Sequence, residues 1–299
     1  MTMTTAQFSN LVLPGISKTV EYGMNLRESL IPRLFNIQQS SQYQEQTIGV
    51  GGISVDAWGN YAKAGKPSAV DFNEGHLKTF IHDEFVVEMI IKRSLLEDDK
   101  HGIIKGHAMR LGISAFQKRE IDAASVFNNA FTGTSGPDSL SLCHATHTGT
   151  PDGGVTGDNT GTSALSATQL SADRTSMMKF TDDKGNKLGI TPDEILVPVD
   201  LEDTALTAIS PGGLPGTANN DINPQGRRWT PIVWHQLTDV NNWFMLDSVE
   251  RQMDLLWWDR VPLHLMVVRE TTTEFVIEAR MRYTYGWADW RFVYGNAVA

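Results

Sequence analysis

The sequence predicts an α+β fold, and three features carry this prediction. A helical pattern runs without interruption from about residue 102 to residue 130, which at 1.5 Å per residue gives a helix about 40 Å long. Apolar and polar residues alternate from Phe275 to Tyr283, as in a half-buried strand. Between Gln42 and Phe80 lies a glycine-rich segment with few side chains that could fill a core. With 299 residues, the chain is long enough for two compact lobes.

The first part of the chain, from Leu11 to Phe35, is expected to be a loosely ordered arm with one short helix. Apolar residues recur there at helical spacing, and Pro32 interrupts the pattern; they are Leu26, Leu30, Leu34 and Ile37. The glycine-rich segment that follows is expected to form a long, exposed hairpin.

The long helix carries an apolar stripe and is too long to be buried throughout, so we expect a spine on which other elements lie. The stripe consists of Ile104, Ala108, Leu111, Ala115, Ala123, Val126, Phe127 and Ala130. Residues 132–168 are rich in Gly, Ser, Thr, Asp and Pro and are expected to be surface loops. A helix from Leu170 to Phe180, a buried strand at 195–199 and a helix that stops before Pro211 predict a second α/β lobe.

Composition narrows the class of function. The formal net charge is -10, with 25 basic and 35 acidic residues, which argues against a protein that binds nucleic acid through its phosphates. Cys143 is the only cysteine, so no intrachain disulfide forms and synthesis in a reducing cytoplasm is expected. No apolar run is long enough to span a membrane, and no secretory signal is recognised. Walker, GxSxG and HExxH motifs are absent, which favours a protein that is not an enzyme.

The segment LCHATH is the sharpest candidate for chemistry. Its Cys143, His144 and His147 are of the types that bind zinc. A zinc site needs three or four ligands and no second ligand pair with metal spacing follows, so we assign no metal, no cofactor and no catalytic residue. A hydrolase that uses these three residues, with or without zinc, stays open as an alternative.

Other exposed residues are candidates for contacts between subunits. Lys63 and Lys66 lie in the glycine-rich hairpin. A lysine in an exposed loop is more often a solvated surface residue than a nucleophile. Trp58 lies in the same segment, and Arg227 and Arg228 follow a proline in NPQGRRW. Seven of the eight tryptophans occur from residue 229 to residue 290, and Trp243, Trp257, Trp258, Trp287 and Trp290 are expected to fill a core or an interface rather than a ligand pocket.

Three stretches, in this order, resemble the major head proteins of tailed bacteriophages, including those of Mu-like phages. The first is FSNLVLPGISKTVEYG, and the second is the end of the long helix, VFNNAFTG, followed closely by LCHATH. The third is TPDEILVPVDLEDTALTAISP with its sequel from WFMLD to EARMRYTYGWADWRFVYGN. The resemblance covers nearly the whole chain, and the order and spacing of the stretches make it specific.

This resemblance implies the Hong Kong ninety-seven capsid fold and a division of the chain. The N-terminal arm would be residues 1–43, and the extended β-hairpin loop residues 44–80. A peripheral domain with the spine helix at about 102–130 would be residues 81–188, an axial domain residues 189–271, and a strand returning to the peripheral domain residues 272–299. Some relatives cross-link a loop lysine to an asparagine of a neighbouring subunit, which would give Lys63 or Lys66 that role.

The resemblance also implies the function. The chain would be the major capsid subunit that self-assembles, as hexamers and pentamers, into an icosahedral head enclosing double-stranded DNA without sequence-specific binding. The expected partners are a separate scaffolding protein or protease, a portal and decoration proteins, with no membrane. The chain would be assembled in the host cytoplasm and end in the virion. The alternatives are a cellular nanocompartment shell of the same fold, the hydrolase from another class, and a tail or baseplate structural protein, which the long hairpin and spine helix disfavour.

Overall fold

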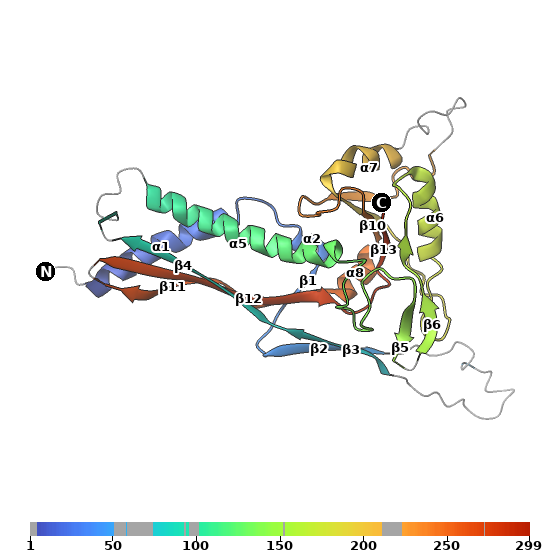
Figure 1. The fold of residues 1–299 in the computed structure, drawn as a ribbon, viewed down its shortest axis with the longest axis horizontal. Helices are drawn as coiled ribbons and strands as arrows, with labels where there is room; N and C mark the ends of the chain where they lie inside the picture. Colours follow the sequence, from blue (N-terminus) through green and yellow to red (C-terminus); the bar gives the residue numbers. More distant parts are fainter. Residues whose placement is uncertain are drawn as a thin grey trace.

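The computed structural model of the chain describes residues 5–50, 58, 74–92, 94–95, 102–151, 153–210, 223–271 and 273–299. These residues form an elongated lobe built on a long sheet and a compact lobe that contains the C-terminus (Figure 1). In the described part of the chain, no helix is long and apolar enough to cross a membrane.

The elongated lobe consists of one four-stranded sheet with two helices along one face (Figure 1). In order across the sheet, the strands are β1 (Asn36–Gln39), β11 (Leu255–Glu270), β12 (Glu274–Trp287) and β4 (Asp83–Lys92). β1 runs parallel to β11, and the other pairs are antiparallel. The helices are α1 (Thr5–Met24) and α5 (Ile103–Asn128). The predicted strand and the predicted long helix are therefore confirmed, with small shifts at their ends.

Most of the expected apolar stripe of α5 is buried. Ile104, Ala108 and Ala115 are buried in its first half, and Ala123 and Phe127 in its second half. The first half packs on Phe275 and Ile277 of β12, which confirms that α5 is a spine shared by several elements.

The expectation of a loosely ordered arm was wrong, because the chain forms a long helix there, α1, which ends at Met24. The expected short helix at Pro32 is confirmed as a single turn, α2 (Ile31–Leu34). Pro32 lies in that first turn, where its missing N–H costs nothing, and Ile37 belongs to β1, where it pairs with Trp257. Sheet pairing thus overrides the helical spacing.

Helix α1 is held against α5 by an unusually close approach of the two backbones. A Cβ added at Gly112 would lie 2.0 Å from the carbonyl oxygen of Val20, and one added at Gly23 would lie 2.3 Å from that of Met109. Both clashes are with backbone, which cannot rotate away. Small residues at these two positions are therefore required for the helix pair.

We predict opposite effects of alanine at two glycines of α5. Gly112→Ala should lower the free energy of unfolding by about 1–3 kcal/mol, because α1 must move away. Gly106→Ala is the matched control, since a Cβ there meets nothing within 4 Å, and it should raise the free energy by up to about 1 kcal/mol. Urea unfolding of the isolated subunit measures both, and equal effects would contradict the close contact.

The predicted hairpin is confirmed where the structure describes it. β2 (Gln44–Val50) pairs antiparallel with β3 (Glu74–Ile81), and the pair projects from the elongated lobe toward the compact lobe (Figure 1). Apart from Trp58, residues 51–73 lie outside the described residues, as do Lys63 and Lys66.

The compact lobe contains a five-stranded sheet and three short helices. Its strands, in order, are β7 (Thr160–Gly161), β13 (Val293–Asn296), β10 (Trp243–Leu246), β8 (Glu194–Val197) and β9 (Thr230–Val233). The helices are α6 (Ala167–Met177), α7 (Glu202–Ala208) and α8 (Ser248–Asp254), and a two-stranded sheet of β5 (His147–Thr150) and β6 (Gly153–Gly157) lies beside them. The expected strand and helices of the second lobe are confirmed, while residues 132–168 contain short strands among the expected loops.

The sheets group the chain differently from the expected domain ranges. β11 falls within 189–271 but pairs with β1 and β12 in the elongated lobe. β13 falls within 272–299 and β7 within 81–188, yet both belong to the sheet of the compact lobe. The physical reason is that the chain crosses between the lobes several times, so that each lobe takes strands from distant parts of the sequence.

Tryptophans fill the interior of both lobes, as expected for core residues. Trp243 and Trp257 are fully buried, and Trp258, Trp287 and Trp290 are at most 7% exposed. Trp257 stacks on Tyr283, with ring centroids 4.7 Å apart, and carries the guanidinium of Arg119 over its ring. These aromatic contacts make the sheet of the elongated lobe a single packed unit with α5.

Candidate functional site: the His147 cluster and the outward face of the hairpin

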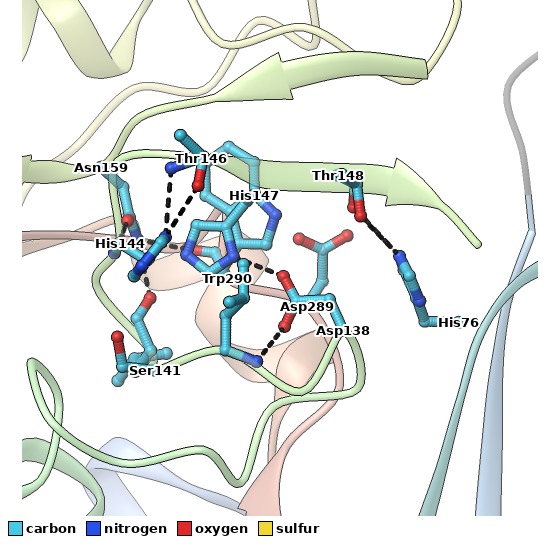
Figure 2. A network of polar contacts seen from close by, with 12 residues as sticks. His76, Asp138, Ser141, His144, Thr146, His147, Thr148, Asn159, Asp289 and Trp290 are labelled. Carbon is cyan, nitrogen blue, oxygen red and sulfur yellow. Dashed lines mark hydrogen bonds and ion pairs between the residues drawn. The ribbon is translucent and has the colours of Figure 1, made fainter. Parts of the chain in front are cut away.

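The LCHATH segment lies in a polar cluster where the compact lobe meets the hairpin (Figure 2). The His147 side chain is fully buried, and its Nδ1 lies 2.6 Å from Oδ2 of Asp138. Its ring stacks on Trp290, with centroids 4.6 Å apart and planes 9° apart. Burial alone would raise the pKa of Asp138, but the hydrogen bond and the charge of His147 lower that pKa below its ordinary value. The pair fixes the loop before β5 to the core.

Cys143 and His144 do not complete a catalytic or metal site. The Cys143 thiol is buried, and this burial raises its pKa far above the ordinary value, so that it stays protonated and is a poor nucleophile. His144 points its Nδ1 at the backbone N and Oγ1 of Thr146, each 3.2 Å away. Among the described residues, no three His, Cys, Asp or Glu side chains are placed to hold a metal ion. The geometry thus gives the hydrolase alternative no support.

The buried pair predicts a large stability effect at Asp138. Asp138→Ala should cost about 1–3 kcal/mol of unfolding free energy, because it leaves Nδ1 of the buried His147 ring without its partner. In the wild type this contribution is present above pH 4 and is lost as the pH falls through the lowered pKa of Asp138. Urea unfolding at neutral pH checks the variant, with the exposed Asp158→Ala as control; equal losses would contradict a special role of the pair.

In the part of the hairpin that the structure describes, three side chains of one face attach it to the rest of the chain. His76 Nε2 lies 3.2 Å from both the carbonyl oxygen and Oγ1 of Thr148 in β5 (Figure 2). Lys78 Nζ donates to the carbonyl of Ser135, and Phe80 packs on Trp258 with ring centroids 4.7 Å apart. Residues 76, 78 and 80 alternate along β3, so all three contacts come from the same face. Burial lowers the pKa of the Lys78 ammonium.

In the described strands of the hairpin, the opposite face is largely exposed and carries no charged side chain. Its residues are directly opposite one another in the strand pair: Gln44 with Ile81, Gln46 with Thr79 and Ile48 with Leu77. We call these six residues the outward face. Ile48 is 57% exposed, and Leu77 and Ile81 are each 52% exposed. An uncharged surface with three exposed aliphatic side chains on a projecting hairpin is typical of a surface that another protein covers.

Of the residues predicted for contacts between subunits, the structure describes Trp58, Arg227 and Arg228. Trp58 is 85% exposed, and Arg227 and Arg228 are exposed in a turn where Arg227 has a φ of 65°. Within the described residues, no side-chain hydrogen bond or ion pair holds these three residues. The outward face was missed by sequence reasoning, although the single aliphatic residues Ile48 and Leu77 in otherwise polar strands were the available signal.

Comparison of this structure with solved structures shows which class of protein has this fold. The chain is similar to the capsid of cyanophage P-SCSP1u, with a TM-score of 0.59 at 11% identity over 91% of this chain and 89% of that one. It is similar to the chain of Mycobacterium phage Patience, with a TM-score of 0.58 at 8% identity over 99% and 89%. A virus-like particle from Pyrococcus furiosus gives 0.52 at 10% identity over 93% and 96%. The fold is that of phage capsid subunits.

The sequence itself gives the family. A family model described as phage capsid protein matches residues 84–296, which is more than half of the chain. The chain therefore belongs to the phage capsid protein family and is a major subunit of a capsid shell, a structural protein of the virion. The predicted α+β capsid fold is confirmed, and the family favours a phage capsid over a cellular nanocompartment. A search of curated proteins found no match.

Proposed function

We propose that copies of this chain assemble as hexamers and pentamers into a closed icosahedral head, with the outward face of the hairpin lying on a neighbouring copy. The observation that carries this proposal is the division of the hairpin into an attached face and an uncharged, exposed face. Burial of apolar surface contributes about 25 cal/mol per Å². Summed over the contacts of a shell, covering this face on every copy therefore contributes several kcal/mol to assembly.

We propose that the two lobes have different roles within the shell. We assign the hairpin to the extended loop, the sheet of β1, β11, β12 and β4 with α1 and α5 to the peripheral domain, and the five-stranded sheet to the axial domain. This assignment replaces the continuous ranges drawn from the sequence, because the strands of each lobe come from several parts of the chain. In this assignment, the extended loop contacts a neighbouring subunit beside the peripheral domain, and the axial domain makes the contacts around the capsomer ring.

The genome is proposed to be enclosed without specific contacts. A formal net charge of -10 repels phosphates, so DNA can be packed and released without adhering to the wall. Several further expectations stay predictions. They are the scaffolding, protease, portal and decoration proteins, assembly in the host cytoplasm, the likeness to Mu-like phages in particular, and a lysine cross-link at Lys63 or Lys66.

Electron microscopy of the purified protein tests the proposal. The chain is expressed alone and then with its neighbouring genes, and the particles are imaged in negative stain. Closed icosahedral shells or capsomer rings are expected, whereas a monomer under both conditions, or open tubes, would contradict the proposal. The contents of filled particles separate the two kinds of shell, since DNA indicates a phage head and an enzyme cargo a nanocompartment.

A further inference from the structure

The long sheet of the elongated lobe has a second face that α1 and α5 do not cover. Tyr283 of β12 donates through its hydroxyl to Asp122 of α5, which fixes the direction of that residue toward the helices. Because neighbouring residues of a strand point to opposite faces, Arg282 points away from the helices. On β4, Val86 and Ile90 are 47% and 56% exposed. Among the described helices, none packs on this second face.

Two arginines and a histidine gather on this second face where the hairpin joins the sheet. Arg282 is opposite Glu84 of β4, and His82 is the residue between β3 and β4. Arg260 is the extra residue of a β-bulge, since Asp259 pairs with Tyr283 and Val261 with Arg282. A bulge redirects the side chain that it carries. We call Arg260, Arg282 and His82 the arginine patch.

The arginine patch has hydrogen-bonding groups without partners. Within the described part of the chain, Arg260 Nη1, Arg282 Nε and His82 Nδ1 are buried atoms with no hydrogen-bond partner. His82 is only 4% exposed, and its Nε2 lies 3.1 Å from Oγ of Ser40. Buried donors without acceptors are costly, so such a cluster indicates that an acceptor is supplied from outside.

Charged side chains of both signs surround His82. Burial lowers the pKa of His82 first, Arg260 and Arg282 lower it further, and Glu45 and Asp83 raise it. The two guanidinium groups carry the positive charge of the patch, and each has an N–H donor without a partner among the described residues. Carboxylates are the acceptors that match the two-pronged geometry of a guanidinium.

The setting favours a protein carboxylate over a phosphate. The Arg282 guanidinium lies 6.0 Å from the ring of Tyr43, which is 63% exposed, and arginines beside aromatic rings are typical of protein interfaces. Exposed Glu84 and Glu88 lie on the adjacent strand, and their repulsion is stronger for a polyphosphate than for a single carboxylate. The patch also adjoins Ile81 of the outward face. In a shell, the neighbour at this position is a second copy, whose sequence carries 35 acidic residues.

We infer that the arginine patch is a docking surface for an acidic side chain of a second copy of this chain. The contact extends the interface formed by the outward face across the root of the hairpin. This inference rests on the proposed assembly into a shell, and it adds an ion pair between subunits to the apolar contact of the hairpin.

Charge removal at the patch is the first test. The double variant Arg260→Gln and Arg282→Gln should lower the yield of assembled particles about tenfold or more, because the incoming carboxylate is left without its partner. Arg269→Gln is the matched control on the same sheet, since Arg269 is exposed and pairs only loosely, at 3.8 Å, with Glu274; its yield should equal that of the wild type. An equal yield for the double variant would overturn the inference. Circular dichroism of the isolated subunits shows whether the double variant is folded.

A cross-link decides the case even if the double variant folds poorly. In particles of Arg282→Lys, a carbodiimide joins the new amine to any carboxylate in contact. Particles are built from equal parts of heavy-isotope and ordinary subunits, and the linked peptides are identified by mass spectrometry. Pairs with one heavy and one ordinary peptide support the inference, whereas links only within one copy, such as to Glu84, or no links overturn it. If the wild-type chain forms no particles at all, the proposed function fails instead.

Discussion

Replacing Ile48 and Leu77 together by aspartate is expected to abolish the formation of shells. The two side chains are opposite each other in the hairpin and are more than half exposed, so the isolated subunit should lose no more than about 0.5 kcal/mol of stability. In the assembled particle, the same change would bury two charges in an uncharged contact, which costs several kcal/mol at every copy. Sedimentation of the assembly mixture measures the loss, expected to be complete.

The control for this experiment keeps the apolar character of the face. Ile48→Leu combined with Leu77→Met should assemble as the wild type does, because apolar area is retained and an interface tolerates such exchanges. Shells formed in normal yield by the aspartate variant would show that the outward face stays exposed to solvent in the particle. A control variant that also fails to assemble would show instead that the hairpin contact depends on shape at these two positions.

The second large effect is expected in the core. Trp257→Ala should lower the free energy of unfolding of the subunit by about 3–5 kcal/mol. Trp257 is fully buried, packs against Phe35 and Tyr283, and donates its indole N–H to Asp259 at 3.0 Å. Its removal leaves a cavity beneath α5 and takes one hydrogen bond from Asp259, which still pairs with Arg119. Urea unfolding of the isolated subunit measures the change.

Trp58→Ala is the matched control, since the side chain of Trp58 is 85% exposed. It should change the free energy of unfolding by less than about 0.5 kcal/mol. Similar losses for the two tryptophans would contradict the assignment of Trp257 to the core. An effect of Trp58→Ala on assembly alone would support its predicted role between subunits.

The regular elements were predictable because local pattern and tertiary packing agree there. α5 and β12 each bury one face against a large partner. Their apolar residues therefore recur with the period of a helix or a strand, which can be recognised in the sequence. The short helix at Pro32 was predicted, but its spacing was wrongly extended to Ile37, which pairs with Trp257 of β11, 220 positions away. Long-range pairing of this kind leaves no local signal.

The site was harder to predict than the fold. The segment LCHATH was considered as a zinc or hydrolase site because of its residue types. In the structure, its His147 pairs with Asp138 and stacks on Trp290, so it belongs to a buried structural cluster. The outward face and the arginine patch depend on which face of a strand is covered. That depends on the arrangement of the lobes, which composition and spacing do not reveal.

A map of the assembled particle at side-chain resolution tests the central claim most directly. We predict a closed shell in which Ile48 and Leu77 of each hairpin are covered by a neighbouring copy, with the compact lobes meeting around each capsomer. A particle in which the outward face of the hairpin points into solvent, or in which the chain forms an open tube, would contradict this account.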